Sequence, residues 1–508
     1  MAHLRPRRRL ALAVPVALSL TASLGFLPTA AQATPRAQST AQAAEDSYAY
    51  LVNTRTDPYT IKSVKAAINA AGGSVVVSYD RIGVIVVHST DLDFARKIRT
   101  VRGVQSAGAS RTSPVRSAQT TDQGAVQYLS KAEAAKLAKS STAGEEPLEA
   151  DQWDLRAIGA DKAAEINPGS RKVTVAVIDT GVDDTHPDIA PNFSAAQSAN
   201  CVSGKADSSY GAWRPVNDGH HYHGTHVAGE IAAARNGIGV AGVAPGVQVA
   251  SITVAQPDAN SLFFPESVVC AFVFAADHGV EVTNNSYYVD PWLYNCMDDP
   301  DQRAIVDAVN RAQLYAQRKG TLNVASAGNS NDDLDSHALV DGSSPDDSTP
   351  VNRTVDPHEC FDVPTQLPGV VTVSATGVKG VKSYYSSYGY GVVDVAAPGG
   401  DKYQIPDTPS KNGRILSTLP NDSYGFLQGT SMASPHVAAV AALLKSTHPW
   451  ATPAQLQALL KAEAVNPGCP AGPYDGDGDG VVDATCVGGK RVNGFYGFGI
   501  VNALQAVQ

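Results

Sequence analysis

The stretch from Val173 to Asp179, "VTVAVID", constrains the fold more than any other part of the chain. Its apolar residues run almost without interruption, which is typical of a strand buried on both faces, as in the parallel sheets of α/β proteins. The run stops at Asp179, which is followed by Thr180 and Gly181. Open α/β sheets place their sites at the carboxyl ends of such strands, so Asp179 is a candidate functional residue. Taken alone, it would more often be a turn or cap residue.

A histidine stands at the start of the next candidate helix, "HGTHVAGEIAAA", residues 223–234. Small residues follow His223 and would let the helix pack closely against its neighbours. A single histidine in this position is usually structural. The nearby His220, His221 and His226 also admit a metal site, but no clear carboxylate or thiol ligand set accompanies them.

A serine occupies the equivalent position in "GTSMASPHVA", residues 429–438, before an alanine-rich apolar run. Ser431 is predicted at a helix start, where unpaired backbone N–H groups and the helix dipole favour developing negative charge. Pro435 is expected within the first turn, where a missing N–H costs little. In isolation, Ser431 would be interpreted as an N-cap.

Together, the three residues indicate nucleophilic catalysis. A serine hydroxyl needs a base to take its proton, and the base needs a carboxylate to orient it. The chain order Asp179, His223, Ser431 is the order found in subtilisin. The stretches "VAVIDTGVD", "HGTHVAG" and "GTSMASPHVAA" resemble the three signatures of the subtilisin-like serine proteases, the subtilases.

This resemblance implies a fold and further site residues. The expected fold is α/β, a subtilisin-like three-layer arrangement with a mostly parallel central sheet, over residues 149–508. The stretch "NVASAGNS", residues 323–330, resembles the strand that ends at the oxyanion-hole asparagine, which implies Asn329. Asn329 and Ser431 would then form the oxyanion hole. The stretches "GVAPGVQVASITV" and "GFGIVNALQAV" also fit the family.

The chain departs from the family where substrate should bind. Subtilases usually carry Ser-Leu-Gly on the strand that pairs with the substrate backbone, and here Ser286, Tyr287 and Tyr288 stand in that place. Together with Ala327 and Gly328, these are the predicted substrate-binding residues. Since Tyr288 replaces a glycine, the pocket walls should differ from those of subtilisin. Polar insertions near 290–305 and 329–360 lengthen loops beside the same groove.

The front of the chain is predicted to be a separate module. From residue 48 to a short strand near Gln105, the chain shows the order β-α-β-β-α-β of a ferredoxin-like unit, with the second helix in "DLDFARKIRTVRGV". A free-standing ligand-binding domain is the alternative interpretation. The module resembles the inhibitor-like subtilase propeptide, which gives a propeptide domain at 34–110. Residues 111–148 are polar and small, and they are predicted to be an exposed linker and processing region.

The first 33 residues have the order of a secretory signal: Arg5 and Arg7 to Arg9, an apolar run, and then "AQA". The apolar run is shorter than the ~20 residues that a membrane anchor needs. Residues 1–144 hold 18 Lys and Arg against 8 Asp and Glu, whereas residues 145–508 hold 21 against 41. A basic front and an acidic back would attract each other, and the acidic back argues against a nucleic-acid partner.

All six cysteines lie in the acidic part, and an even number in an exported chain suggests disulfides. Cys469 and Cys486 bracket one short segment and are the simplest pair. For the other four, three pairings are open. One of them joins Cys296 to Cys360, which would brace the substrate groove, and Cys201 to Cys270.

The stretch "DGDGDGVVD", residues 475–483, is a candidate calcium loop. The carboxylates of Asp475, Asp477, Asp479 and Asp483 would repel one another unless a cation joined them, and Ca²⁺ prefers such oxygen ligands. Cys486 stands where an EF-hand loop has its bidentate glutamate, so the site would be weak. The alternative is a solvated acidic hairpin.

The sequence therefore predicts a secreted, extracellular serine endopeptidase that is made as a self-processed zymogen. Its partners would be polypeptide substrates and its own propeptide, acting as intramolecular chaperone and inhibitor. Neither nucleic acid nor membrane is expected as a partner, and the mature form would be a monomer. No catalytic cofactor is expected, and structural calcium is the one ion predicted. The alternatives are a narrow-specificity processing protease and a non-enzymatic subtilase-like binding protein.

Overall fold

The structure is a computed structural model that describes residues 46–114, 125–258 and 260–508. The predicted signal, residues 1–33, lies outside the described residues. Within the described part of the chain, no helix combines the length and the apolar character needed to cross a membrane.

The front module is the predicted ferredoxin-like unit. Its elements are β1 Tyr48–Thr54, α1 Pro58–Ala70, β2 Gly73–Tyr79, β3 Val84–Ser89, α2 Phe94–Ile98 and β4 Val104–Ala109. The strands form an antiparallel sheet in the order β2-β3-β1-β4. The second helix is shorter than the stretch predicted for it, since α2 ends at Ile98.

The sheet of this module buries both faces, because successive residues of a strand point to opposite sides. Val52 and Ile85 join the core that this module forms with its own helices. Leu51 and Val86 point the other way and belong to an apolar cluster that includes Phe272 of the second part of the chain. The module is therefore packed on the rest of the protein through one face of its sheet.

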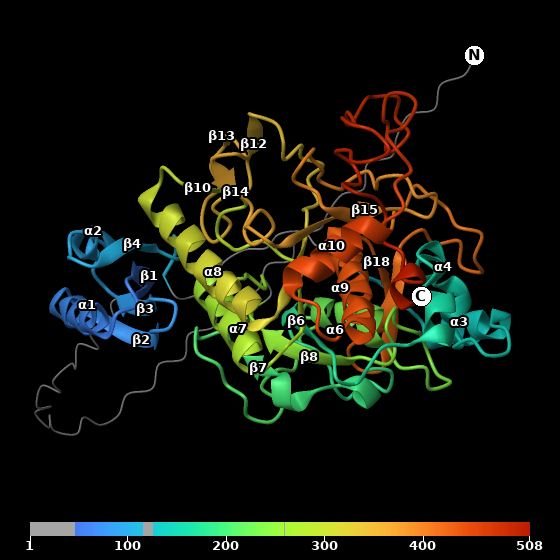
Figure 1. The fold of residues 1–508 in the computed structure, drawn as a ribbon, viewed down its shortest axis with the longest axis horizontal. Helices are drawn as coiled ribbons and strands as arrows, with labels where there is room; N and C mark the ends of the chain where they lie inside the picture. The colour runs from blue at the N-terminus through green and yellow to red at the C-terminus, as the bar shows by residue number, and fades with distance from the viewer. Residues whose placement is uncertain (1–45, 115–124, 259) are drawn as a thin grey trace, which may run out of the picture. The chain divides into compact units, whose positions relative to one another are not determined.

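The second part contains the predicted α/β sheet. Its seven strands are β6 Thr174–Asp179, β7 Ala199–Asn200, β8 Gln248–Thr253, β9 Val282–Asn285, β11 Leu322–Ser326, β15 Val371–Thr376 and β16 Val395–Pro398. They are all parallel and lie in the order β16-β15-β11-β9-β6-β8-β7. Figure 1 labels β15, β6, β8 and β7 of this sheet. This arrangement confirms the fold class expected from the apolar run.

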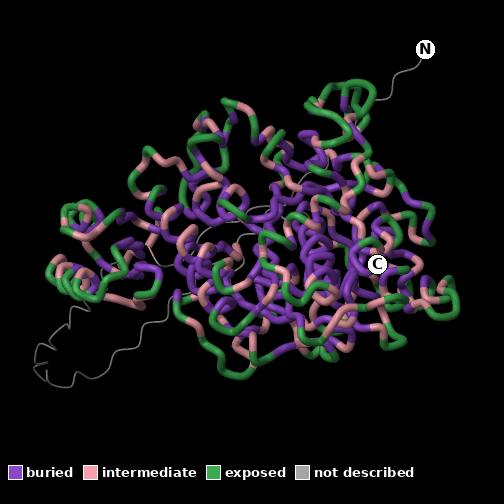
Figure 2. Tube along the Cα trace, in the orientation of Figure 1, coloured by how far each residue is buried: buried purple, intermediate pink, exposed green. Residues whose placement is uncertain are grey.

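Helices cover both faces of the sheet, which explains why β6 is apolar throughout. Val175 and Val177 pack in the core of α6 His223–Ala232 and α9 Thr430–Thr447. Ala176 and Ile178 pack in the core of α7 Pro265–Asp277 and α8 Pro300–Lys319. Figure 2 shows the resulting buried interior, with exposed residues mainly in the loops and on the outer helices.

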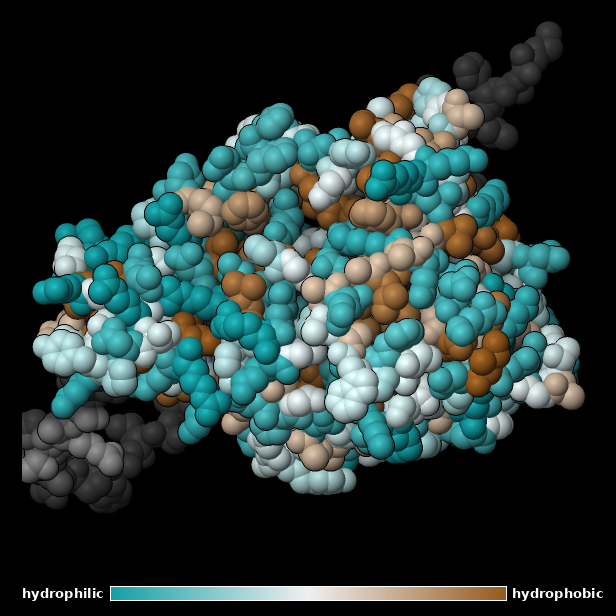
Figure 3. All heavy atoms as spheres, viewed as in Figure 1, coloured by the Kyte–Doolittle hydropathy of each residue, from teal (hydrophilic) through white to brown (hydrophobic). Residues whose placement is uncertain are grey.

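Shorter elements complete the fold. The helices are α3 Lys131–Leu137, α4 Trp153–Ala157, α5 Ala160–Ile166 and α10 Pro453–Glu463, and the strands are β5 Gln127–Leu129, β10 Asn295–Cys296, β12 Leu339–Asp341, β13 Arg353–Val355, β14 Cys360–Phe361, β17 Ile415–Leu419 and β18 Ser423–Leu427. In the part of the chain that the structure describes, 3₁₀ turns cover Ala138–Ser140, Glu149–Asp151, Ala190–Asn192, Ala195–Gln197 and Gln505–Val507. The face drawn in Figure 3 is mainly hydrophilic, with scattered apolar residues, as is usual for protein surfaces.

Part of the segment predicted as an exposed linker is packed against the second part of the chain. Strand β5 pairs antiparallel with β18 and extends the β17-β18 hairpin to three strands. Leu137 and Leu148 are buried in a small cluster with Phe426. The chain after residue 124 is therefore attached to the 149–508 region by both hydrogen bonds and apolar contacts.

Three disulfides join Cys201 to Cys270, Cys296 to Cys360, and Cys469 to Cys486. Of the three pairings left open for the first four cysteines, the structure has the one that joins Cys201 to Cys270 and Cys296 to Cys360. Residues Cys296 and Cys360 also face each other in the β10-β14 ladder.

A buried histidine ties three helices together. His436 of α9 lies 3.1 Å from Asp154 of α4 through Nε2 and 2.7 Å from the carbonyl oxygen of Met432 through Nδ1. The Glu230 carboxylate of α6 lies 3.4 Å from the same ring. Both ring nitrogens face acceptors, so both must carry protons. Burial alone would lower the pKa of His436, but the two carboxylates raise it to about 10.

We predict that this histidine makes the protein less stable as the pH rises from about 6.5, the usual histidine pKa, to about 10. A group whose pKa is raised by folding contributes its full stability below the unfolded pKa and loses it as the pH passes the folded pKa. The free energy of unfolding should therefore fall over this window by on the order of a few kcal/mol more in the parent than in His436→Gln. Chemical denaturation at pH 6, 8 and 10 measures this.

The matched control is His448→Gln, which changes an exposed histidine just after the same helix. It should follow the parent at every pH. If His436→Gln and the parent lose the same stability between pH 6 and 10, the buried imidazolium is not responsible.

Candidate active site

Three segments that are far apart in the sequence meet at the carboxyl edge of the central sheet. Asp179 is the last residue of β6, His223 is the first residue of α6, and Ser431 is the second residue of α9. Strand β9, which lies beside β6, runs into Ser286 at the same edge. The parallel register of the sheet therefore brings the predicted residues to one place.

The carboxylate and the imidazole form a buried pair. His223 Nδ1 lies 2.9 Å from each carboxylate oxygen of Asp179. The backbone N–H of Thr180 donates to Asp179 Oδ1 over 2.7 Å and fixes the carboxylate. Burial alone would lower the pKa of His223, but the Asp179 charge more than offsets this and raises the pKa above its usual value. The pair can thus accept a proton on the free nitrogen of the ring.

The serine and the histidine are not hydrogen-bonded to each other in this structure. His223 Nε2 is buried and has no hydrogen-bond partner in the described part of the chain. The hydroxyl of Ser431 donates instead to the carbonyl oxygen of Ser286, over 3.3 Å. Hydrogen bonds of a catalytic site are often long or misaligned until substrate binds.

The start of α9 differs from the prediction in the position of its proline. Because the helix begins at Thr430, Pro435 lies inside it, beyond the first turn. A proline here cannot donate to the carbonyl four residues earlier, which is that of Ser431. The hydroxyl of Ser286 donates to this carbonyl over 2.8 Å and replaces the missing bond. The proline therefore links the nucleophile's backbone to the strand predicted to bind substrate.

The side chain of Asn329 is oriented by the same helix start. Its Oδ1 accepts from the backbone N–H of Thr430 over 2.8 Å and from the Thr430 hydroxyl over 2.9 Å. With the oxygen occupied, the amide NH₂ is left as the free donor, and Asn329 is exposed. In the first turn of α9, the N–H groups of Met432 and Ala433 donate to the Gly429 carbonyl, over 3.0 and 3.4 Å, whereas the Ser431 N–H has no carbonyl four residues earlier within the helix. These are the two kinds of donor that can stabilise an oxyanion.

A cavity of about 220 Å³ opens beside Ser431. Of the residues predicted to bind substrate, Ser286, Tyr287, Tyr288 and Gly328 line it. Ala327 does not line it and is buried behind, in a cluster with Tyr294. The hydroxyl of Tyr288 donates to Asp346 over 2.7 Å, so the tyrosine that replaces the family glycine is held by an inserted loop.

The inserted loops, and the segment just after the second of them, also bring residues that the sequence did not predict. Asp290, Leu293, Ser343 and Asp362 all line the cavity. Asp362 stands two residues after Cys360 in "ECFDVP", and this proximity to a groove cysteine was the only signal in the sequence.

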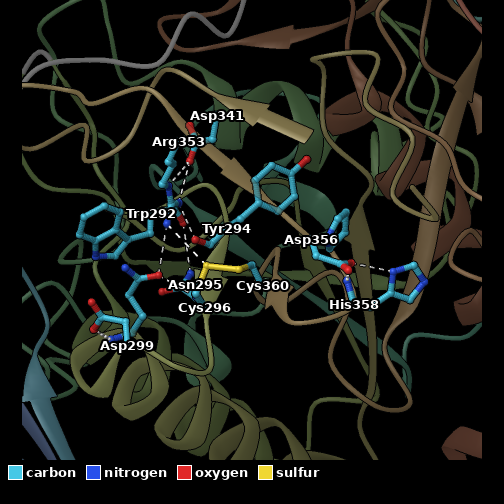
Figure 4. The surroundings of a disulfide bond; sticks show 12 residues. Trp292, Tyr294, Asn295, Cys296, Asp299, Asp341, Arg353, Asp356, His358 and Cys360 are labelled. Carbon is cyan, nitrogen blue, oxygen red and sulfur yellow. Dashed lines mark hydrogen bonds and ion pairs between the residues drawn. A yellow bond between two sulfur atoms is a disulfide. The ribbon is translucent and has the colours of Figure 1, made fainter. Parts of the chain in front are cut away.

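The loops that carry these residues are fastened around the Cys296–Cys360 disulfide (Figure 4). Arg353 binds Asp341 through two nitrogens, over 2.7 and 2.9 Å, and its guanidinium lies 4.8 Å from the ring of Trp292. A disulfide and an ion pair, in which two guanidinium nitrogens share Asp341 Oδ2, therefore brace these loops.

The candidate calcium loop is partly assembled. The carboxylates of Asp475, Asp477 and Asp483 lie within 4.8 Å of one another, and Asp479 lies outside this group and accepts from the N–H of Val481. Within the described residues, His337, Asp356 and His358 form the other group of possible metal ligands. His220, His221 and His226 do not form one there: His221 contacts Asp218, and His226 contacts Glu230.

Comparison with known families gives one extended match. The profile of the subtilase family matches residues 170–499. Fervidolysin of Fervidobacterium pennivorans is 31% identical over 343 residues, which are 63% of this chain and 41% of that protein. Subtilisin NAT of Bacillus subtilis subsp. natto is 32% identical over 292 residues, 58% of this chain and 60% of that protein. The matched region therefore covers about two fifths of the length of fervidolysin and three fifths of the length of subtilisin NAT.

Solved structures show the same fold. The epidermin leader peptide processing serine protease of Staphylococcus aureus is 23% identical, with a TM-score of 0.66 over 91% of this chain and 98% of that chain. The crystal structure of fervidolysin is 25% identical, with a TM-score of 0.58 over 92% of this chain and 62% of that chain.

Proposed function

The chain belongs to the subtilase family, and on this premise we propose that it is a serine endopeptidase that hydrolyses peptide bonds of polypeptides through an acyl-enzyme. The observation that carries the proposal is the meeting of Asp179, His223 and Ser431 at one edge of the sheet, with the Asp179–His223 pair already formed. A protein that only bound polypeptides would require neither the buried Asp179–His223 pair nor the oriented side-chain amide of Asn329.

The first half of the reaction transfers the acyl group to the enzyme. His223 Nε2 takes the proton of the Ser431 hydroxyl while Oγ attacks the carbonyl carbon of the substrate. Asp179 holds the imidazole through Nδ1 and stabilises the positive charge that develops on the ring. The carbonyl oxygen becomes an oxyanion, which accepts from the Asn329 amide and from the backbone N–H of Ser431. His223 then donates its proton to the leaving amine as the C–N bond breaks.

The second half releases the product. A water molecule gives a proton to His223 Nε2 and attacks the ester carbonyl of the acyl-enzyme. The same donors stabilise the second oxyanion. When it collapses, the C–O bond to Ser431 breaks and the serine recovers its proton from the histidine.

We also propose that the ferredoxin-like module is a propeptide and that the protease cuts it away itself. The packing of the module on the second part supports this: Asn53 donates to the carbonyl of Ala304 over 2.9 Å, and Arg311 donates to the carbonyl of Thr54 over 2.8 Å. Arg111, just after the module, forms a buried ion pair with Glu266 over 2.6 Å. Domain bounds of 34–110, 111–148 and 149–508 follow from this proposal.

We also propose that the protein is secreted and that its mature form is a monomer. Three disulfides fit an oxidising compartment outside the cytosol, and the signal-like order of residues 1–33 would provide export.

We predict that Ser431→Ala abolishes hydrolysis of an unstructured protein substrate such as casein, because the variant lacks the nucleophile. The fall in kcat should be on the order of 10⁶, as expected when a residue of a catalytic triad is lost. Ser446→Ala removes a hydroxyl from the far end of the same helix and should keep activity. Equal activity of Ser431→Ala and the parent would contradict the proposal.

If the protease cuts away its own front segment, a second prediction follows for Ser431→Ala. Mass spectrometry of Ser431→Ala, produced without other proteases, should find residues 34–148 still attached. The parent should be cut between about residues 110 and 150. An efficient cut of the inactive variant in this range would show that another protease does the processing.

We further propose that the loop of Asp475, Asp477 and Asp483 binds calcium, since carboxylate oxygens are the donors that Ca²⁺ prefers. With a weak site of Kd about 10⁻⁴–10⁻³ M, 10 mM calcium should stabilise the protein by about 1–3 kcal/mol relative to chelator. The Tm of the Ser431→Ala protein should rise by a few degrees, and Asp475→Asn/Asp477→Asn should lose this rise.

Asp479→Asn is the matched control for the loop and should keep most of the gain, because its carboxylate lies outside the group. If the double variant shows the same calcium-dependent rise as its parent, the ion binds elsewhere or not at all.

A further inference from the structure

Two buried carboxyl groups line the cavity beside the nucleophile. Asp290 is 2% exposed and Asp362 is 3% exposed, and both contribute to the wall that also includes Ser431 and Asn329. Asp290 is the first residue of the insertion near 290–305, and Asp362 follows the insertion 329–360 by two residues. Carboxyl groups so deeply buried are uncommon unless they are paired or bind a cation.

The Asp290 carboxyl already has partners within the protein. It accepts from the backbone N–H of Phe263 and shares a hydrogen bond with the Asp346 carboxyl. Asp346 in turn accepts from the hydroxyl of Tyr288. Asp290 is therefore part of a closed network in the cavity wall.

Asp362 is different, because one of its oxygens has no such partner. Its Oδ1 is buried and accepts no hydrogen bond from the described residues. Its Oδ2 lies 3.9 Å from the position that a Cβ on Gly328 would occupy. Gly328 immediately precedes Asn329, so the Asp362 carboxyl lies in the cavity wall next to the strand end that carries the proposed oxyanion donor.

The cavity offers no positive charge to balance this carboxyl. Lys, Arg and His are absent from the described residues that line it, and neither Asp290 nor Asp362 forms an ion pair with another described residue. Burial raises the pKa of the Asp362 carboxyl well above its usual range, and nearby Asp332 adds to this. A cation that entered the cavity would compensate the charge and gain a strong, charge-assisted hydrogen bond.

The position of Asp362 is fixed by the fold of the loops. It follows β14, whose Cys360 is bridged to Cys296 of β10, and its backbone N–H donates to Gln366 over 2.8 Å. Figure 4 shows the Cys296–Cys360 bridge together with the Arg353–Asp341 pair that braces the same loops. A charged group held in this way can select among substrates by its position as well as by its charge.

We propose that this cavity binds the side chain of the substrate residue whose carbonyl Ser431 attacks, and that Asp362 makes the enzyme select lysine or arginine there. The inference rests on the proposed function and names its substrate class. The cavity, at about 220 Å³, is far larger than the ~10–15 Å³ that one water needs, so it admits a side chain. An apolar side chain would leave the Asp362 oxygen buried and unpaired.

The chain's own processing region is consistent with this preference. Residues 111–148 contain five basic residues after which a cut would release the front module: Arg111, Arg116, Lys131, Lys136 and Lys139. A protease that selects basic residues would therefore find sites for its own maturation in this segment.

The test measures kcat/KM for peptides that differ only in the residue before the scissile bond: Arg, Lys, Gln, Leu or Phe. The parent should cleave the Arg and Lys peptides about 10–100-fold faster than the Leu and Phe peptides, the range of a buried charge-assisted hydrogen bond. Asp362→Asn should lower the Arg-to-Leu ratio by at least about tenfold, and Asp362→Glu should retain part of it. Asp332→Asn, a nearby half-buried carboxyl outside the cavity lining, should change the ratio far less.

A second measurement does not depend on any variant folding. Benzamidine, a cationic mimic of the arginine side chain, should inhibit the parent more strongly than neutral benzamide, by a factor of about ten or more. Preference of the parent for Leu or Phe, an unchanged ratio in Asp362→Asn, or equal inhibition by the two compounds would each overturn the inference. Cleavage of none of the peptides, and no more casein hydrolysis than Ser431→Ala, would overturn the proposed function and this inference with it.

Discussion

The parallel register of β6, β9 and β11 is the constraint on which the rest of the active site depends. Ile178 and Ala325 both pair with Asn285, so the three strands end at the same height. Asp179, Ser286 and the turn to Asn329 follow directly from these ends. Because each strand is packed between helices on both sides, none can slide by a residue without moving its apolar side chains out of the two cores.

The start of α9 places the nucleophile Ser431 at this edge of the sheet and orients the side chain of Asn329 there. Pro435 removes one hydrogen bond inside the helix, and the hydroxyl of Ser286 satisfies the carbonyl of Ser431 in its place. Thr430 orients Asn329 through two hydrogen bonds from its backbone and hydroxyl. The helix that carries the nucleophile is thus joined to both neighbouring strand ends by hydrogen bonds, and the positions of the three groups are coupled.

The sequence alone was enough to predict those features of the fold and the site that depend on local residue patterns and on motifs. The unbroken apolar run before Asp179 predicted a strand between two helix layers, and the alternation in residues 48–54 predicted β1 of the ferredoxin-like unit. Asp362 could not be predicted, because its place in the cavity depends on how two long loops fold against each other. The pairing of β5 with β18 was missed for a related reason: a three-residue strand has too little pattern to show which distant edge it joins.

The buried pair of Arg111 and Glu266 has a consequence for the lifetime of the complex between the two parts. While the chain is continuous, the guanidinium is held beside Glu266, and against the ring of Phe264 at 3.8 Å, at a high effective concentration. A cut between residues 114 and 125 would turn this contact into one between separate chains. Departure of the front segment would then separate Glu266 from the cation that is buried with it. Dissociation would break this buried ion pair and the contact with Phe264, so the front segment should leave more slowly than one held by exposed contacts alone.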